Sequence, residues 1–238
     1  MKMASIKGLF LVSLFFLLTL SSTHAQELKT IKLNEPNKKR GLPVMEALSL
    51  RASVREWSDK EVSLQDLSDL LWAANGINRP EIKKRTAASA MNAQDVDIYV
   101  FMKDGVYLYD AANHALNPVA SGDFRSKMGM RPGPPPGGPG TPPAGAPRGG
   151  LPGPESPAPI QLMLISDTSR FRGGTPEIKL EWGAIDTGIV SQNIALFCAA
   201  TGMATRPRAS FDREAIKSIL KLKDTQYPFL NHPIGYPK

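Results

Sequence analysis

The chain contains one cysteine in 238 residues, so it cannot close a disulfide within itself. That residue, Cys198, lies in an apolar stretch at residues 194–200. A thiol in such a stretch behaves as a small buried hydrophobic side chain rather than as a nucleophile. The stability of the fold must therefore come from a packed core or from association between chains.

Histidine is also scarce. Of three histidines, His24 falls in an N-terminal leader, and only His114 and His232 remain, without cysteine partners or paired carboxylates at ligand spacing. The chain also lacks a persuasive Ser-His-Asp or Cys-His order, the phosphate loop of nucleotide hydrolases and the GxGxxG motif. We therefore expect no metal site, and catalysis by side chains alone has little support.

The N-terminus has the features of a secretory signal. Lys2 and Lys7 precede an apolar run at residues 8–20, and Ala25 is a small residue suited to cleavage. The run is too short for a comfortable membrane span, which needs about 20 apolar residues. We predict that residues 1–25 are a signal peptide and that the mature chain is exported without a membrane span, in a bacterium to the periplasm. An uncleaved anchor is the alternative.

The charge balance is modestly basic. The formal charge is +7, and loss of the two leader lysines leaves 27 basic against 22 acidic residues, or +5. Such an excess suits an anionic cofactor, whereas nucleic acid is not an expected partner because no dense basic run alternates with aromatic residues. The densest cluster, at residues 38–40, belongs to an N-terminal segment at residues 26–42 that we interpret as a solvated arm.

The hydrophobic pattern predicts one α+β domain over residues 43–238. Helices precede a β-hairpin, and a buried strand then leads to long helices. In order, we expect a short helix from Pro43 to Arg51, a helix capped by Ser63 and ending near Gly76, hairpin strands at 97–102 and 106–109 around Asp104-Gly105, a strand at 160–165, a central helix at 184–203 and a helix capped by Asp212.

A proline- and glycine-rich segment interrupts this domain at residues 131–159. It lacks the strict glycine-every-third pattern of collagen, so we expect a disordered or polyproline-like insertion that loops out of the domain. A ligand for a proline-binding partner and a tolerated surface insertion are both open as its role.

The strongest candidate for chemistry is Arg51-Ala52-Ser53-Val54-Arg55. In an extended segment, alternate residues project to one side, so two guanidinium groups and a hydroxyl could hold a phosphate by charge-assisted hydrogen bonds. A solvated basic turn would have the same composition. The pattern alone therefore leaves both interpretations open.

Two further segments could contact a ring system. Residues 89–94 combine small and amide side chains, among them Asn92 and Gln94, that offer hydrogen-bond donors and acceptors to a polar ring edge. The second segment, residues 202–212, is a loop that contains Pro207 and follows the long apolar helix. An ordinary loop could have either composition.

Together these motifs resemble those of the nitroreductase family. Its members carry an Arg-x-Ser-x-Arg/Lys element and a Leu-rich helix that ends in Trp-Ala-Ala-x-Gly, as residues 70–76 do here. A Ser-x-x-Asn-x-Gln segment, a long helix with Gln-Asn and a loop with Pro four residues before Phe-Asp follow in the family's order. The resemblance covers most of residues 45–237. The stretches at residues 105–110 and 122–125 look closest to the branch that includes thiazole- and oxazole-forming dehydrogenases.

The resemblance implies a fold and a cofactor. The fold would be a central, mostly antiparallel sheet flanked by helices, in an intertwined homodimer whose interface holds two sites for flavin mononucleotide (FMN). Arg51 and Ser53 would bind the FMN phosphate, and Arg55 and Asn92 would approach the ribityl chain and the pyrimidine edge. Other implied cofactor-binding positions are Gln94 in the same loop as Asn92, and the backbone near Pro207, Arg208, Ala209 and Ser210, which would face flavin N5 and O4. Lys238 is an uncertain substitute for a further phosphate ligand.

The implied activity is two-electron transfer in a ping-pong cycle, from an unidentified donor to an unidentified small molecule. An exported chain has no access to cytoplasmic nicotinamide, so the donor need not be NAD(P)H. Two other hypotheses stay open: a flavin-binding protein without turnover, and an envelope protein that recruits a partner through residues 131–159.

Overall fold

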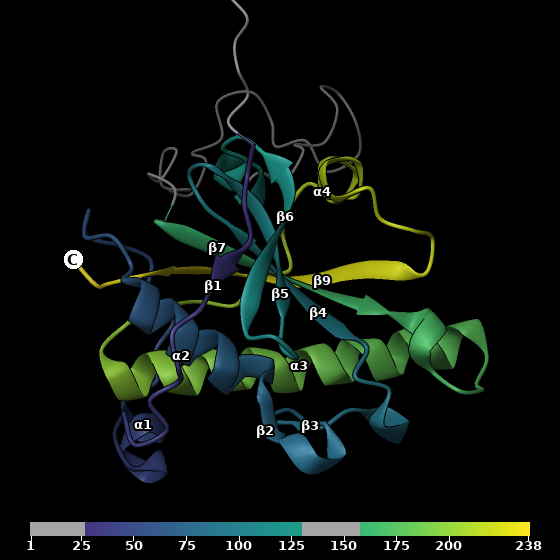
Figure 1. Cartoon of the computed structure of the whole chain (residues 1–238), viewed down its shortest axis with the longest axis horizontal. Helices are drawn as coiled ribbons and strands as arrows, with labels where there is room; N and C mark the ends of the chain where they lie inside the picture. Colours follow the sequence, from purple (N-terminus) through teal and green to yellow (C-terminus); the bar gives the residue numbers. More distant parts are fainter. Residues whose placement is uncertain (1–26, 130–157) are drawn as a thin grey trace, which may run out of the picture.

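The computed structural model describes residues 27–129 and 158–238. The predicted signal peptide at residues 1–25 lies outside these ranges, and so does nearly all of the predicted insertion at residues 131–159. Within the described ranges, no helix is both long enough and apolar enough to cross a membrane. The described residues build one antiparallel sheet with helices on both sides, which confirms the α+β class (Figure 1).

The main sheet has seven strands in the order β1-β6-β5-β4-β7-β9-β8, and every neighbouring pair is antiparallel. A separate pair joins β2 and β3. The strands are β1 (Ile31–Lys32), β2 (Ile77–Arg79), β3 (Lys84–Arg85), β4 (Val96–Phe101), β5 (Gly105–Asp110), β6 (Ala115–Ser121), β7 (Ile160–Asp167), β8 (Ala204–Thr205) and β9 (Gln226–Gly235). The predicted hairpin is confirmed as β4 and β5, which turn through Asp104.

The central strands are apolar on both faces because each face carries its own core. Alternate side chains of a strand point to opposite faces. In β7, Leu162 and Leu164 enter one hydrophobic cluster, whereas Met163 and Ile165 enter the other. The continuous apolar run predicted as a strand buried on both faces is therefore confirmed.

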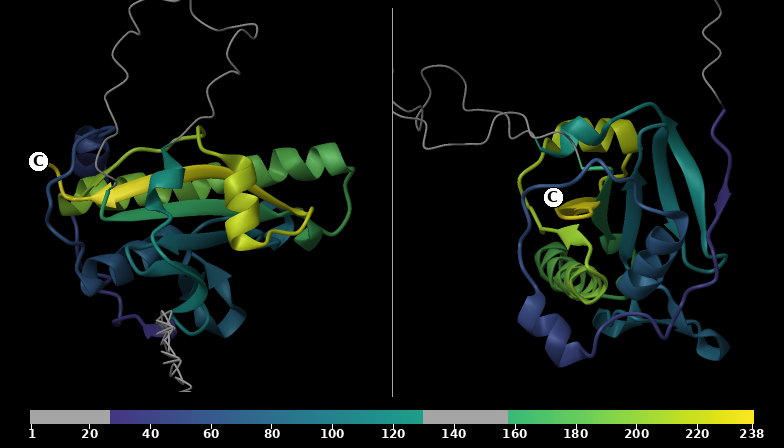
Figure 2. Two further views of the ribbon diagram at one scale, coloured as in Figure 1. Left: turned by 90° about the horizontal axis from the view of Figure 1, so that it is seen from above. Right: turned by 90° about the vertical axis from the view of Figure 1, so that its left-hand side faces the viewer.

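Three helices cover one face of the sheet and one covers the other. They are α1 (Val44–Leu50), α2 (Leu64–Asn75), α3 (Pro176–Thr201) and α4 (Arg213–Leu220). α1 and α2 pack on α3, which contacts β4, β7 and β9. Figure 1 shows the long α3 beneath the strands and α4 above them, and the end-on view in Figure 2 shows α1 beyond α3. α3 is therefore the scaffold that joins α1 and α2 to the sheet.

Helix ends follow the predicted capping residues, with one correction. Ser63 accepts a hydrogen bond from the Asp66 amide, and Asp212 accepts one from the Ala215 amide. The prediction that the central helix begins near residue 184 was wrong: α3 begins at Pro176 after the N-cap Thr175. Its first turns alternate charged residues with the half-buried Ile178, Leu180 and Trp182, so they lack the continuous apolar run from which the helix was predicted.

The sequence pattern missed β9, a long strand that contains prolines. Pro lacks an N–H and is rarely found inside a sheet. The Asn231 amide donates to the Arg208 carbonyl on the outer edge, and Pro233 lies two residues further, so its nitrogen faces the same edge. β8 covers only Ile234 and Gly235, so no ladder hydrogen bond is lost at Pro233.

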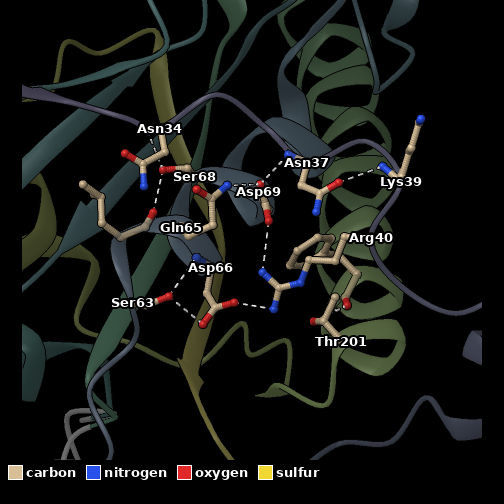
Figure 3. Close-up of polar contacts among 12 residues, drawn as sticks. Asn34, Asn37, Lys39, Arg40, Ser63, Gln65, Asp66, Ser68, Asp69 and Thr201 are labelled. Atoms are coloured by element: carbon tan, nitrogen blue, oxygen red, sulfur yellow. Dashed lines mark hydrogen bonds and ion pairs between the residues drawn. The ribbon is translucent and has the colours of Figure 1, made fainter.

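The N-terminal segment at residues 26–42 is not simply a solvated arm. Its β1 pairs with β6, and Arg40 forms ion pairs with Asp66 and with Asp69, the latter at 3.0 Å (Figure 3). The Arg40 guanidinium also lies 5.8 Å from the centre of the Phe197 ring of α3. The interpretation of residues 38–40 as solvated was therefore wrong for Arg40.

The Asp66 and Asp69 carboxylates, which pair with Arg40, are nearly buried at the start of α2. We use the word hub for the cluster that they form with Arg40, Ser63 and Tyr236. Burial alone would raise the pKa of Asp66, but hydrogen bonds from Tyr236, Ser63 and Arg40 outweigh it and lower the pKa. Tyr236 follows β9, so one hub ties α2 to residues near both ends of the described chain.

We predict that Arg40→Ala lowers the free energy of unfolding by about 2 to 3 kcal/mol, because Asp66 and Asp69 keep their negative charges in a nearly buried place without a cation. Urea denaturation near neutral pH measures this. Lys39→Ala, which removes an exposed neighbouring cation, should leave the stability within about 0.5 kcal/mol. Equal effects of the two substitutions would contradict a structural role for the hub.

Candidate functional site

The predicted phosphate-binding segment, residues 51–55, is extended and leaves α1 at Arg51. The Val54 amide donates to the Thr205 carbonyl at 3.0 Å. Arg51, Ser53 and Arg55 are exposed. That these three side chains project to one side stays a prediction from strand-like alternation, and their exposure is compatible with it.

The Val54–Thr205 bond brings a second predicted segment to the first, since Pro207 to Ser210 follow directly after β8. Arg208 forms a bridge to β9, in which its amide and its carbonyl both pair with Asn231. Its side chain donates to Gln161 at 3.0 Å. The backbone N–H and C=O of Arg208 are therefore both hydrogen-bonded to β9, whereas the next two residues, Ala209 and Ser210, are exposed.

The C-terminus meets the same region. The Ser58 amide donates to the Tyr236 carbonyl at 3.0 Å, and Trp57 forms an isolated bridge with Pro237. Lys238 comes next and is exposed. The structure thus gathers residues 51–58, the loop after β8 and the C-terminal residues at one end of the sheet.

A buried histidine supports this convergence. His232 on β9 is in hydrogen-bond contact with Ser191 of α3 at 2.8 Å and with Thr205 of β8 at 3.1 Å. Burial, and then the positive charge of Arg208, lower the pKa of His232 to about 3. The neutral ring donates through one nitrogen and accepts through the other. It therefore holds the end of β8, where the Thr205 carbonyl accepts the Val54 amide.

The predicted ring-contacting loop, residues 89–94, has an unusual backbone. Met91, Asn92 and Gln94 have φ values of 52°, 55° and 50°, in the left-handed region that costs a non-glycine residue about 1 to 2 kcal/mol. Met91 and Asn92 are exposed at its tip. Such strain persists only where the surrounding structure holds it, and it concentrates at functional sites.

Gln94 holds the loop rather than presenting an amide to a ligand. Its side-chain oxygen accepts from Arg85 at 2.9 Å, and its side-chain nitrogen donates to the Lys83 carbonyl at 2.9 Å. Its backbone carbonyl accepts from Arg170 at 2.9 Å. Because the side-chain amide is engaged inside its own chain, we correct the prediction that Gln94 binds a cofactor directly.

The predicted site residues form two separate groups in one chain. The 89–94 loop is anchored at Asp186, in the first half of α3, by a hydrogen bond from the Ala90 amide at 2.8 Å. The other group is joined to α3 further along the helix, where Ser191 reaches Thr205 through His232. The structure therefore joins residues 51–55 to the loop after β8, and holds the Asn92 loop at a different point of α3.

Sequence reasoning gave no structural role to two residues that hold this site, His232, which carried no motif, and Asp186 of the long helix. Asn193 belongs to the Gln-Asn pair of the resemblance, and its side chain donates to the Ala74 carbonyl at the end of α2. Polar residues in otherwise apolar elements are the signal that could have marked His232 and Asp186. Within the described ranges, no group of three metal-ligating side chains was found.

Comparison with known proteins identifies relatives of the whole domain. The model of the nitroreductase family matches residues 48–236. A protein of Methanocaldococcus jannaschii, named as a nitroreductase, is 26% identical over 206 residues, which covers 82% of this chain and 94% of the relative.

Solved structures agree with this match. A crystal structure from Ralstonia eutropha, described as that of a nitroreductase, has 29% identity and a TM-score of 0.75, and it covers 88% of this chain and 90% of its own. A chain of the microcin synthetase complex of Escherichia coli has 15% identity and a TM-score of 0.61, and covers 96% of this chain and 85% of its own. The second likeness shows a shared fold only.

The buried histidine generates a pH prediction. Because the folded state lowers the pKa of His232 from 6.5 to about 3, its contribution to stability is complete above about pH 6.5 and is lost as the pH falls toward 3. Between about pH 7.5 and pH 5, this loss should amount to about 2 kcal/mol.

His232→Gln keeps a neutral donor and acceptor at every pH. We expect the free energy of unfolding of this variant to fall about 2 kcal/mol less than that of the wild type over the same interval. Denaturant titrations at both pH values measure the difference, and titration of other groups cancels between the two proteins. Parallel pH dependences would show that His232 is not held neutral.

Proposed function

The chain belongs to the nitroreductase family, and from this premise we propose that it is an FMN-dependent oxidoreductase acting on a small molecule. When bound, FMN would supply two-electron transfer, first with a donor and then with a second substrate. The chain itself would bind, orient and electrostatically tune the cofactor. The observation that carries the proposal is the convergence of residues 51–55 with the loop after β8.

The residues at this convergence fit a phosphate and a flavin edge. Arg51 and Ser53 offer a guanidinium and a hydroxyl from one exposed side of an extended segment, which suits a phosphate. Arg55 on the same side would approach the ribityl chain and the pyrimidine edge. A cation there stabilises negative charge that develops on a reduced ring.

The loop after β8 would contribute backbone rather than side chains. Pro207, Ala209 and Ser210 are exposed, whereas Arg208 is bound to β9. We propose that the backbone near Ala209 and Ser210 faces flavin N5 and O4, with Arg208 as the residue that fixes the loop. Lys238 is near enough in the chain to the Trp57–Pro237 bridge to serve as a further phosphate ligand.

The separation of Asn92 from this group supports a homodimer. α3 exposes Ile185, which is 55% accessible, together with Gly188 and Gln192 on one side. α1 adds Met45, which is 75% accessible, and Leu48. Exposed apolar surface of this kind marks an interface. A two-fold axis across α3 would reverse the partner helix and bring its Asn92 loop toward the phosphate-binding group of the first chain.

The location and the branch are also proposals. The leader at residues 1–25 supports export to the periplasm. The electron donor and acceptor would then be periplasmic compounds rather than cytoplasmic nicotinamide. The motifs at residues 105–110 and 122–125 support membership of the branch with thiazole- and oxazole-forming dehydrogenases. The activity of that branch is not part of the proposal.

Reconstitution with FMN tests the cofactor. The protein without its leader should retain flavin absorption after removal of free FMN, and a reductant should bleach it. Arg51→Ala should weaken FMN binding about 10- to 100-fold, because it removes a charge-assisted hydrogen bond worth about 1.5 to 3 kcal/mol. Arg172→Ala, at an exposed arginine before α3, is the matched control and should bind normally.

The outcomes separate the rival functions. Tight binding of FMN that no donor can reduce would favour a flavin-binding protein without turnover. No flavin binding by a folded dimer would overturn the proposal, and loss of a partner on deletion of residues 131–159 would then favour the interaction role. Normal affinity in Arg51→Ala would refute the phosphate assignment alone.

Subunit complementation tests the shared site. Asn92→Gly removes the amide but permits the left-handed backbone, so this variant and Arg51→Ala should each be defective in FMN binding while still folding. In a mixed dimer, one of the two sites combines the unchanged Arg51 of one chain with the unchanged Asn92 of the other. When equal amounts of the two variants are refolded together, about half of the dimers are mixed. Tight FMN binding should therefore return to about one site in four.

Ile185→Lys on the α3 face should abolish both the dimer and this recovery, as measured by light scattering during size-exclusion chromatography. Val119→Lys on β6 places the same charge on another exposed apolar side chain and should leave the dimer intact. A monomeric wild type that binds FMN, or no recovery from the mixture, would contradict the shared site.

A further inference from the structure

Two buried carboxyl groups lie behind the strained loop at residues 89–94. Asp186 of α3 is 2% accessible and accepts the Ala90 amide at 2.8 Å. Asp95, which follows the loop, is fully buried and accepts the Ser166 hydroxyl at 2.5 Å. The side chains of Asp95 and Asp186 also hydrogen-bond to each other.

A hydrogen bond between two carboxyl groups requires a proton, because two carboxylates offer only acceptors. Among the described residues, no N–H or O–H donor reaches Oδ1 of Asp95. Burial, and then hydrogen bonding and charge from Asp186, raise the pKa of Asp95 to about 7 against the opposing Ser166 hydrogen bond. Asp95 therefore holds a proton at pH values below about 7.

The surrounding cations form their ion pairs and hydrogen bonds with other groups, and the charge of Arg170 reaches Asp95 without a direct ion pair. Arg170 of the turn after β7 is directed to Asp97, with contacts of 3.0 and 2.5 Å, and also forms a longer ion pair with Asp167. Arg85 from β3 is directed to Gln94. The strand and helix that enclose the pair, β7 and α3, contribute Ser166 and the backbone of Gly183, whose missing side chain lets α3 approach Ser166.

We propose that Asp95 and Asp186 are positioning residues that share one proton and thereby hold the Asn92 loop in its strained conformation. With the proton present, Asp186 stays beneath the Ala90 amide. Without it, two negative charges face each other in a buried place, and movement of the loop relieves their repulsion. The carboxyl pair binds the proton more tightly when the loop is anchored than when it is released. Anchoring is therefore favoured at low pH and is lost as the pH rises through neutrality.

The consequence for FMN rests on the proposed function, since Asn92 is the residue that the loop would present. FMN affinity should then weaken as the pH rises, through loss of the anchored loop rather than through the phosphate-binding group. The loop itself can be followed without FMN, which separates the two claims.

Hydrogen exchange of the Ala90 amide is the first measurement. In the wild type, its protection, corrected for the intrinsic pH dependence of exchange, should fall about tenfold between about pH 5.5 and pH 8.5. Asp95→Asn and Asp186→Asn each replace the shared proton with amide hydrogens, so their protection should not change with pH. Asp224→Asn, at an exposed carboxylate after α4, should behave as the wild type.

FMN titrations over the same interval are the second measurement. Affinity should fall with pH in the wild type and in Asp224→Asn, and much less in the two variants of the pair. Constant Ala90 protection in the wild type, or the same pH dependence in Asp95→Asn, would overturn the proton-sharing anchor. If exchange behaves as expected but no FMN binds at any pH, the anchor stands and the proposed function fails.

Discussion

Gly183 allows α3 to lie directly against β7, and the positions of both candidate site groups depend on that close approach. A Cβ at this residue would overlap the side chain of Ser166. Once α3 lies there, its first half reaches the 89–94 loop through Asp186, and its end delivers the chain to β8. One rigid helix thus supports both groups.

Buried polar contacts tie each group to this helix. Just past the middle of α3, Ser191 contacts His232, which in turn contacts Thr205, the acceptor for Val54. In its first half, Asp186 contacts both Asp95 and the loop. Apolar side chains would fill such spaces at lower desolvation cost. The polar pairs instead specify one orientation of the segments that carry the candidate site.

The sequence predicted those features that depend on neighbouring residues. The caps at Ser63 and Asp212, the β4–β5 hairpin and the doubly buried β7 follow from local hydrogen bonding and from strand alternation. β9 was missed because its suitability for proline depends on an outer edge that β8 barely covers.

Long-range partners explain the remaining errors. Arg40 has the local composition of a solvated cluster, and only folding brings Asp66 and Asp69 to it. Gln94 fits a cofactor motif, yet its amide is taken by Arg85 and Lys83. The two-group division of the site has no local signature either, since it results from contacts with two different points of α3, at Asp186 and at Ser191.

The sheet ends in strands of two residues on both sides, β1 and β8. The edges that they leave uncovered carry Pro118 on β6 and Pro233 on β9, where an N–H donor is missing. A foreign strand would therefore find an interrupted hydrogen-bonding template at either edge. Interrupted edges would oppose edge-to-edge polymerisation, and they would leave the helical face, with its exposed Met45 and Ile185, as the surface for self-association.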